Sequence, residues 1–294
     1  MTNDIQYSRK KHHSPAVTVA VMVLIAVMLV ILTFVGIYLA GYRYLKKEFS
    51  DGSYIKFFGR VDELGTPIAG NLYYSDGASA EIDLETSTVT YSNGTVYEGT
   101  LVDLQKNGNG TLTFPSGDIY RGQFQNDQIT GKGTYAFLNG DTYEGDFRNG
   151  KKEGYGVYTI AADGSSYEGE FVADAKHGKG TYRWADGSSY TGDYVNDVKH
   201  GKGTYLFANG DTYEGDFLYD VRTGRGTYRW AASGDSYVGE FLNNMMNGWG
   251  LYTWANGRLY EGAFENGTIV RVEIEEPLPD TDTPAQGGEE TPAP

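Results

Sequence analysis

The sequence contains no cysteine, only four histidines, and eight prolines that fall mostly at its carboxyl end. The absence of cysteine excludes disulfide bonds, thiolate metal sites and cysteine nucleophiles. Basic residues are scarce as well: the 294 residues carry 24 Lys and Arg against 39 Asp and Glu, a formal net charge of −15. Because nucleic-acid binding requires a basic surface, we expect no nucleic-acid partner.

Glycine and tyrosine are abundant instead, with 41 and 25 residues. Glycine costs about 1 kcal/mol at each position inside a helix, so this composition favours β-hairpins over helices. The charge is unevenly placed. Residues 1–50 carry six basic and two acidic side chains, whereas the remainder carries 18 basic and 37 acidic ones. The chain therefore combines a basic, apolar amino-terminal part, residues 1–50, with an acidic, tyrosine-rich remainder, residues 51–294, which we call the body.

Residues 16–42 contain no charged side chain and read AVTVAVMVLIAVMLVILTFVGIYLAGY. As a helix they would be about 40 Å long against a hydrocarbon core of about 30 Å, which predicts one tilted transmembrane helix. A buried helix of a soluble core and a cleaved signal peptide are the alternatives. Signal peptides have apolar regions of about 7–15 residues that end at a small-x-small site. This run is longer, and the bulky residues of its end, Leu39–Tyr42, make a poor cleavage site. We therefore predict that the segment is retained as a signal-anchor.

The orientation of this helix is set by the basic residues on its two sides, whose numbers are nearly equal. The basic tail 1–15 precedes it, and a similar number of Lys and Arg residues follows: Arg9, Lys10, Lys11, Arg43, Lys46 and Lys47. His12, His13 and the amino terminus favour an N-inside arrangement under the positive-inside rule. We therefore expect an extracytoplasmic body, with a cytoplasmic one still open.

The body repeats one motif eight times. Tyr-x-Gly triplets recur at intervals of 23 or 24 residues, starting at Tyr97, Tyr120, Tyr143, Tyr167, Tyr190, Tyr213, Tyr237 and Tyr260. A Gly-x-Gly pair lies between successive triplets, as in Gly131-Lys132-Gly133, and is followed by x-Tyr-x-Phe or x-Tyr-x-Trp. A fixed period of this length is typical of a stacked repeat architecture.

Alternation with a period of two makes each repeat a β-hairpin, with aromatic and glycine positions on one face and polar positions on the other. Asn139-Gly140 and its equivalents supply the positive φ angles of the hairpin turn. The two 24-residue intervals place their extra residue at the hairpin tip, where it leaves the strand faces in register. Gly145 leaves a gap in which an aromatic ring lies over the backbone.

These expectations give an all-β fold, an elongated single-sheet stack of about eight 23-residue hairpin repeats, preceded by one transmembrane α-helix. Residues 43–90 contain decayed motifs and are expected to be a juxtamembrane linker and degenerate capping repeats. The repeat array is expected at 91–272. Residues 273–294 are rich in proline and acidic residues and are expected to form a disordered tail.

The recurring Tyr143-Glu144-Gly145-Asp146-Phe147, followed by Gly154-Tyr155-Gly156, resembles the MORN repeat (membrane occupation and recognition nexus). The resemblance covers about Tyr91 to Phe264 and implies an elongated sheet of hairpins that serves as a scaffold. Dimerisation and membrane association are also implied, since they occur among members. Aromatic, glycine-rich cell-wall-binding repeats are a rival class, but their Gly-Trp and Trp-Tyr-Tyr doublets are missing here.

No catalytic set of nucleophile, base and orienting residue, no metal-ligand set and no cofactor motif is visible, so we expect no enzyme, no metal and no cofactor. The only candidate contact surface is a line of aromatic residues along the repeats, the aromatic ladder: Tyr182, Trp184, Tyr205, Phe207, Tyr228, Trp230, Tyr252 and Trp254. These rings either pack on their own repeats or remain partly exposed for contact.

We therefore predict a single-pass, membrane-anchored scaffold that contacts the bilayer through residues 16–42. The repeats would bind an unknown protein partner or a second copy of the chain. The alternative is an extracytoplasmic glycan- or cell-wall-binding module that uses the aromatic ladder. A body with this acidic charge would be repelled by anionic lipid headgroups.

Overall fold

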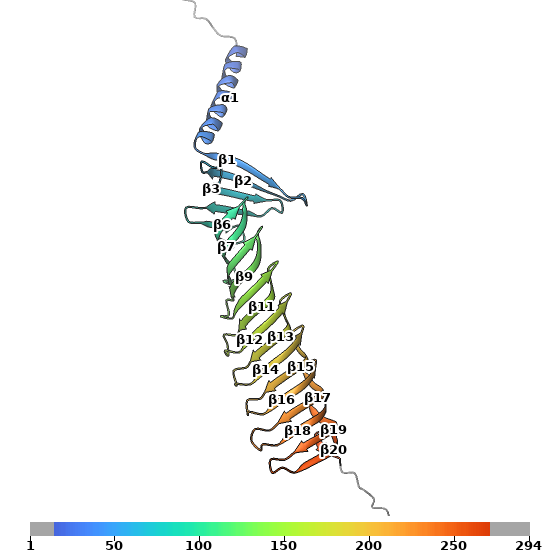
Figure 1. The fold of residues 1–294 in the computed structure, drawn as a ribbon. Helices are drawn as coiled ribbons and strands as arrows, with labels where there is room; N and C mark the ends of the chain where they lie inside the picture. The colour runs from blue at the N-terminus through green and yellow to red at the C-terminus, as the bar shows by residue number, and fades with distance from the viewer. Residues whose placement is uncertain (1–14, 271–294) are drawn as a thin grey trace, which may run out of the picture. The chain divides into compact units, whose positions relative to one another are not determined.

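The computed structural model describes residues 15–270, which form two compact units, residues 15–198 and 199–270. The protein has one amino-terminal helix followed by antiparallel β-strands (Figure 1). The predicted all-β fold of hairpin repeats behind one helix is confirmed. The predicted tail at 273–294, and all but the last residue of the tail at 1–15, lie outside the described residues.

Helix α1 runs from Pro15 to Leu39, and a proline at its first position has no amide that would need a partner. The Ala40 amide donates to the Gly36 carbonyl at 2.9 Å, and Gly41 then takes a φ of +85°, which ends the helix before the expected Tyr42. The most apolar 18-residue stretch within residues 16–39 has a mean hydropathy of 3.1, and the side chains of residues 16–39 are exposed. This length and composition satisfy both a membrane span and a signal sequence.

Five strands occupy the region expected to hold the linker and capping repeats. Each pairs with the next in an antiparallel ladder that continues into β6: β1 (Tyr42–Glu48), β2 (Tyr54–Val61), β3 (Pro67–Tyr74), β4 (Ser79–Asp83) and β5 (Thr88–Tyr91). Phe57, Leu72, Ile82 and Val89 are almost fully buried here. One phenylalanine and three aliphatic side chains thus take the place of the tyrosine core of the regular repeats.

The regular hairpins of the first unit follow: β6 (Val96–Val102), β7 (Gln105–Thr113), β8 (Ile119–Gln125), β9 (Gln128–Ala136), β10 (Thr142–Arg148), β11 (Lys151–Thr159), β12 (Ser166–Val172), β13 (Ala175–Arg183) and β14 (Ser189–Val195). Strands that start a repeat have seven residues and those that return have nine. Successive strands pair so that repeat tyrosines face each other, as Tyr143 faces both Tyr135 and Tyr158.

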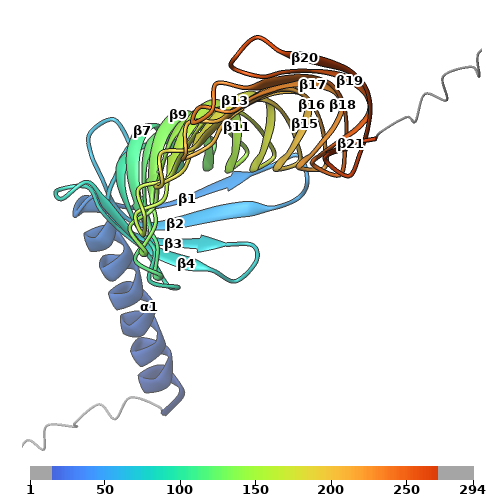
Figure 2. The same ribbon diagram turned by 90° about the horizontal axis from the view of Figure 1, so that it is seen from below.

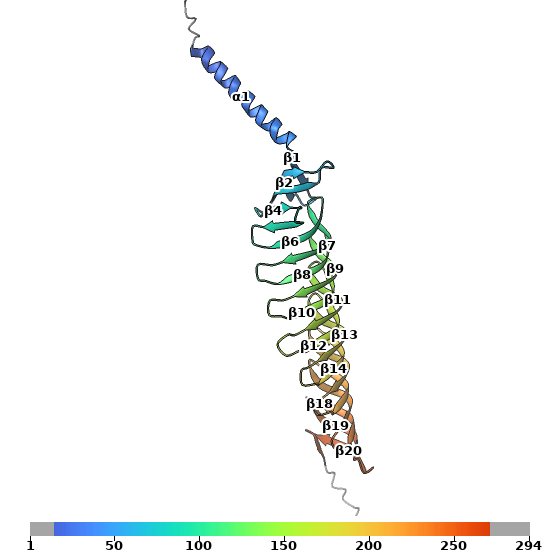
Figure 3. The ribbon, with the colours of Figure 1, turned by 90° about the vertical axis from the view of Figure 1, so that its left-hand side faces the viewer.

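The second unit continues the same pattern: β15 (Val198–Leu206), β16 (Thr212–Leu218), β17 (Val221–Arg229), β18 (Ser236–Leu242), β19 (Met245–Thr253), β20 (Leu259–Glu265) and the two-residue β21 (Thr268–Ile269). The strands of this unit are bent, so the sheet is curved (Figure 2), and its hairpins are seen from the side in Figure 3. A β-bulge in most hairpins, such as the register shift after Gly215, produces local bending of this kind.

The structure corrects the expected turn chemistry. Around Asn139-Gly140 only the glycine has a positive φ, +91°, and the Phe137 amide bonds to Asp141 across a three-residue loop. The two-residue turns with two positive φ angles lie at the opposite end of the strands, for example at Asn126 (+49°) and Asp127 (+69°). Asn and Asp tolerate this left-handed region better than other non-glycine residues.

The extra residue of the longer repeats lies at the hairpin tip, as predicted. Between β11 and β12 the Ile160 amide donates to the Ser165 carbonyl, so the loop is one residue longer than its equivalents. Tyr158 still faces Tyr167 across the strands, and the register of the aromatic face is kept.

Candidate interaction surface

The aromatic face buries its tyrosines without a second layer of secondary structure, because each ring lies flat on two glycines. A Cβ at Gly145 would lie 2.4 Å from the Tyr143 hydroxyl oxygen, and one at Gly156 would lie 2.5 Å from the same ring. The Tyr143 side chain has 0 % exposure, and its hydroxyl donates to the Asp146 carbonyl at 3.0 Å. This confirms the predicted role of Gly145 and adds the glycine of the following strand.

Phenylalanines close the sides of each buried tyrosine. Phe147 and Phe171 both meet the Tyr143 ring edge-on, with ring centroids 5.1 Å apart. Edge-to-face contacts of this kind stabilise aromatic pairs by about 0.5–1.5 kcal/mol beyond the buried area. Because Phe171 belongs to the next repeat, each phenylalanine joins two repeats.

The aromatic ladder forms a second column on the same face, and its rings are only half-buried. In the second unit the six ladder rings contact one another in sequence, with centroid distances of 4.5, 5.7, 4.6, 5.3 and 4.8 Å from Tyr205 to Trp254. In the first unit Tyr182 and Trp184 form a pair at 4.6 Å. The contacting rings are tilted relative to one another, and because the side chains are only half-buried, part of each ring is exposed to solvent.

The same repeat positions carry further rings that the sequence analysis did not select. Phe114, Tyr135, Phe137 and Tyr158 contact one another at 5.8, 4.5 and 5.8 Å in the first unit. Their position after the Gly-x-Gly pair is the sequence feature that could have identified them. Each unit therefore carries a half-buried column of rings, and that of the first unit begins at its first regular repeats.

A carboxylate from the preceding repeat holds most tyrosines of this half-buried position, but serine takes its place before Tyr182 and Tyr205. The Tyr158 hydroxyl donates to Asp141 at 2.8 Å, and the other oxygen of Asp141 accepts the Ala161 amide at 2.9 Å. Asp211 bonds in the same way to Tyr228 and Ala231. One aspartate in the hairpin turn of a repeat thus bonds to both a tyrosine and a turn amide of the following repeat.

These bonds shift the ionisation of both partners. The Ala161 amide and then the Tyr158 hydroxyl hold the pKa of Asp141 below its ordinary value of 3.8. Burial, followed by the bond to Asp141, raises the pKa of Tyr158 to about 12. The sequence analysis missed these aspartates, although Asp141 and Asp211 recur directly after an Asn-Gly turn.

Cations lie between the buried tyrosines and the half-buried column. Lys152 lies 4.9 Å above the ring of Tyr158, Lys176 lies 5.4 Å above Tyr182, and Arg222 lies 5.4 Å above Tyr228. Burial lowers the pKa of both Lys152 and Arg222. Each cation follows a two-residue turn, at the second position of its strand.

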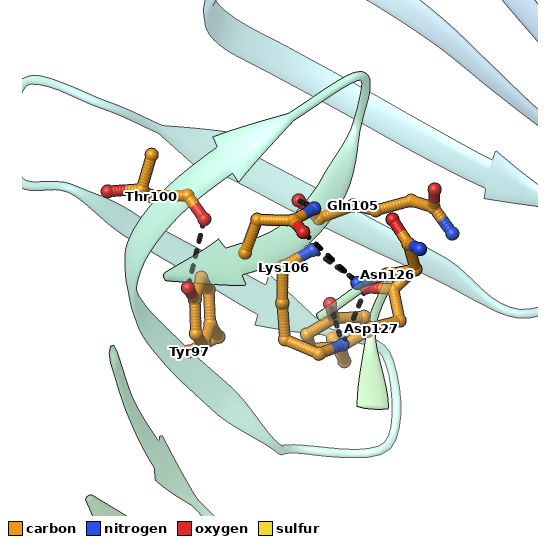
Figure 4. A network of polar contacts seen from close by, with 8 residues as sticks. Tyr97, Thr100, Gln105, Lys106, Asn126 and Asp127 are labelled. Atoms are coloured by element: carbon orange, nitrogen blue, oxygen red, sulfur yellow. Dashed lines mark hydrogen bonds and ion pairs between the residues drawn. The ribbon is translucent and has the colours of Figure 1, made fainter. Parts of the chain in front are cut away.

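An aspartate in the next two-residue turn faces most of these cations. Figure 4 shows the first example: Asp127 accepts the backbone amide of Lys106 at 2.9 Å and forms an ion pair with its ammonium at 3.1 Å. Lys176 with Asp197 and Lys199 with Asp220 repeat the pair at 3.7 and 3.6 Å.

Two repeats replace both members of this pair together. Where the turn residue is Gly150, the cation position holds Ile129, and the Gly150 amide donates to the Ile129 carbonyl at 3.0 Å. Where the turn residue is Gly267, the cation position holds Met246, with the same bond at 2.9 Å. A cation is thus present only where a polar turn residue faces it, as expected for a half-buried charge that needs a partner.

Among residues 15–270 no group of three or more His, Asp or Glu side chains is arranged to hold a metal ion. The surface instead offers aromatic rings fixed by aspartates and cations. This arrangement suits binding by stacking and apolar contact.

The MORN repeat profile matches seven consecutive stretches of this chain: residues 97–119, 120–142, 143–164, 167–189, 190–212, 213–234 and 237–257. These stretches make up more than half of the 294 residues, and the chain belongs to the MORN-repeat family. The expected resemblance is thereby confirmed. The comparison with curated proteins found no match.

Two solved structures show a partial likeness. The TCP domain of Drosophila melanogaster SAS-4 (dCPAP), solved with a proline-rich motif of Ana2 (dSTIL), is 17 % identical at a TM-score of 0.36. The match covers 56 % of this chain and 94 % of that one. The TCP10 domain of Danio rerio CPAP, solved with a peptide of STIL, is 12 % identical at a TM-score of 0.38, over 76 % of this chain and 100 % of that one.

Proposed function

We propose that the protein is a single-pass, membrane-anchored scaffold that binds an extended segment of a partner protein along its aromatic ladder. The protein has no catalytic role in this proposal. The observation that carries it is the half-buried column of rings from Tyr205 to Trp254, whose members contact one another in sequence. Large aromatic side chains dominate the energetics of protein interfaces.

The rings of this column are held in place before any partner binds. Asp211 and Asp235 accept the hydroxyls of Tyr228 and Tyr252, and Arg222 lies over Phe207 as well as Tyr228. Immobilising a flexible side chain on binding costs about 0.5–1.5 kcal/mol. Because these side chains are already ordered, a partner that binds here would avoid that cost.

Helix α1 supports the anchoring part of the proposal through its length and mean hydropathy. The family also favours a scaffold, since stacked repeats present long surfaces for binding. The acidic body disfavours anionic lipid as the ligand of the repeats.

Cross-linking in native membranes tests the scaffold. The variant Trp230→Ala, Trp254→Ala should lose its protein cross-links, because it removes the two largest rings of the second-unit column. Leu218→Ala is the matched control, since Leu218 is 45 % exposed and lies outside the ladder. Cross-links that persist in the double variant would refute the ladder as the contact surface. A cross-linked homodimer lost in the double variant would identify the partner as a second copy.

Glycan binding is the competing outcome. Polysaccharide binding that is lost in the same double variant, with no protein cross-link in the wild type, would replace the scaffold with a glycan-binding module. Binding to polysaccharide that survives the double variant would exclude the ladder as a glycan site.

The side of the membrane can be tested separately. Because the chain has no cysteine, Asn256→Cys in an exposed loop gives a single labelling site. We expect a membrane-impermeant maleimide to label it in intact cells, which would support an extracytoplasmic body. Labelling only after lysis would place the repeats in the cytoplasm and remove surface glycans as ligands. Full-length protein in the washed membrane fraction would support a retained anchor over a cleaved signal sequence.

A further inference from the structure

The hairpin that follows helix α1 is the basic part of an otherwise acidic unit. Residues 42–61, which span β1 and β2, carry five basic and two acidic side chains, a formal charge of +3. Residues 62–198 of the same unit carry nine basic and 21 acidic side chains, a formal charge of −12. An anionic partner would therefore be attracted to this hairpin and repelled by the rest of the unit.

The outward face of the hairpin combines cations with aromatic rings. Ile55 and Phe57 are buried on the other face, so the alternate positions of β1 and β2 point outward. Tyr44 is 59 % exposed and Phe58 45 %. Three cross-strand pairs on this face form what we call the basic aromatic patch: Tyr42 with Arg60, Tyr44 with Phe58, and Lys46 with Lys56.

The two lysines of the patch face each other directly, and like charges at opposite positions destabilise a sheet. Both ammonium groups lie over the single ring of Tyr54, at 5.1 and 4.6 Å. Lys46 also bonds to Glu48, whereas Lys56 has no ion pair with any described residue. An anion outside the chain would offset the repulsion that this arrangement places within the sheet.

The cations of this face are confined to the strands next to the helix. Arg60 faces Ala69 across β2 and β3, and Ala69 faces Asp83 across β3 and β4. Glu81 lies two residues before Asp83 and therefore on the same face. The Arg60 guanidinium also pairs with Glu85 at 3.4 Å. Carboxylates thus replace cations on this face at β4, which gives the face a basic side and an acidic side.

Two contacts join the basic side to the end of helix α1. The Arg43 guanidinium donates to the Tyr38 carbonyl at 2.8 Å and lies 3.7 Å over the ring of Tyr38. The Val61 amide donates to the Gly41 carbonyl at 3.1 Å. Both strands of the hairpin are therefore bonded to the segment where the helix ends.

The patch has the chemistry of the headgroup layer of a bilayer. If α1 spans a membrane, its carboxyl end lies at the headgroups, and the patch begins three residues after Leu39. Amphipathic aromatic rings are enriched at this level, and anionic lipids attract Lys and Arg side chains close to the membrane surface.

We propose that the basic aromatic patch docks on the anionic lipid surface around α1, with its rings at headgroup level and its cations on the lipid phosphates. The proposal rests on α1 being a membrane anchor. It adds a second membrane contact, which lies outside the MORN repeats that start at residue 97. The hairpin is held against the bilayer, while the acidic repeats are repelled from it.

Fluorescence quenching of the full chain in vesicles tests the docking. Because the chain has no cysteine, Tyr44→Cys carries a single environment-sensitive fluorophore in place of one ring of the patch. Spin-labelled lipid should quench this probe in vesicles of phosphatidylcholine with phosphatidylglycerol, and much less in phosphatidylcholine alone. Tyr155→Cys is the matched control: Tyr155 is a 54 % exposed ring on the outward face of the same unit, and its probe should not be quenched by lipid.

Charge should govern the docking. Replacing Lys46, Lys56 and Arg60 by glutamine should lower the ratio of docked to undocked hairpin about a hundredfold, or about 2.8 kcal/mol. A control variant removes as many outward cations from the regular hairpins and should leave the ratio unchanged: Lys132→Gln, Lys179→Gln and Arg183→Gln.

Salt tests the same point without substitution of the cations. Sodium chloride at about 1 M, where the Debye length is about 3 Å, should release the hairpin from the lipid surface. A ratio that stays unchanged in the triple variant of the patch or at high salt would overturn the electrostatic docking.

Alkaline washing of the vesicles separates the docking from the anchor. Extraction of the chain by the wash would refute the anchor, and the docking with it. A retained chain whose Tyr44→Cys probe is quenched by aqueous iodide, and not by spin-labelled lipid, would refute the docking alone. A retained chain whose probe is shielded from both quenchers would overturn the docking in favour of a second copy of the chain on the patch.

Discussion

Gly145 lies directly beneath the ring of its neighbour Tyr143, so close that a Cβ there would meet the hydroxyl oxygen at 2.4 Å and the Gly156 Cα at 2.6 Å. This relationship explains how one sheet buries large rings without a second layer. The tyrosine folds down onto two glycines, and phenylalanines from two repeats close its edges.

The first prediction concerns this contact. Gly145→Ala should lower the free energy of unfolding by about 1–3 kcal/mol, because neither the buried ring nor the paired backbone can move away. Denaturant unfolding of the full chain measures the loss. Glu144→Ala, on the exposed polar face, should change stability by less than about 0.5 kcal/mol. Equal stability of the two variants would contradict the steric role of Gly145.

The second prediction concerns the bond between Asp141 and Tyr158. Tyr158→Phe should cost about 1 kcal/mol, because it removes one hydrogen bond. Asp141→Ala should cost more, since it leaves both the Tyr158 hydroxyl and the Ala161 amide without their acceptor. A double-mutant cycle measured by thermal unfolding would give the coupling. No coupling between the two sites would show that the bond does not join the repeats.

The third prediction follows from the shifted pKa values of the tyrosines. Burial raises the pKa of Tyr120, Tyr158 and Tyr228 from 10.0 to about 12. A raised folded-state pKa adds stability that is complete below the unfolded value and is lost as pH rises through the folded value. Stability should therefore fall between about pH 10 and 12. Tyrosinate absorbance and circular dichroism should change together, and ionisation that precedes unfolding would contradict the burial of these hydroxyls.

The aspartates predict an opposite dependence at acid pH. The pKa of Asp141, Asp211 and Asp235 lies below 3.8 because each carboxylate accepts hydrogen bonds in the folded state. Their contribution is complete above the unfolded value and disappears as pH falls through the lower folded value. The triple Asp→Asn variant should therefore lose less stability than the wild type on acidification below about pH 4. If the stability of the variant and of the wild type fell identically with pH, these carboxylates would be ruled out as the source of the acid sensitivity.

The fifth prediction uses the paired replacement of cation and turn residue. Ile129→Lys alone should destabilise the first unit, because Gly150 offers no carboxylate to pair with the half-buried ammonium of the new lysine. Adding Gly150→Asp should restore about 0.5–1 kcal/mol, since aspartate tolerates the positive φ of +76° and supplies the partner. Urea unfolding of the two single variants and the double variant measures the coupling. Additive effects would contradict the charge pairing.

Much of this architecture follows from local pattern. The alternation of Tyr143, Gly145 and Phe147 predicts a strand face, and the 23-residue spacing predicts that these faces stack. The hairpin-tip position of the extra residues was also predictable, because any other position would reverse the strand faces. The type of turn was not, since both Asn139-Gly140 and Asn126-Asp127 suit a tight turn and only strand pairing distinguishes them.

The ladder shows where local pattern stops being sufficient. Tyr135 and Tyr143 are both tyrosines on the same face, and they face each other across the strands. Tyr143 is fully buried and Tyr135 half-buried, because two glycines lie beneath the first ring only. The partner of Tyr158 is Asp141, 17 residues away, and that distance is bridged only when two turns of successive repeats lie next to each other.

The sequence by itself determined the repeat period, the hairpins, the apolar helix and the need for glycine on the aromatic face, since each depends on the spacing of residue types along the chain. Tertiary structure alone decided which tyrosines are covered and which aspartates hold the half-buried ones. These features arise from strand pairing and curvature, which bring together side chains that have no fixed relation in the linear order.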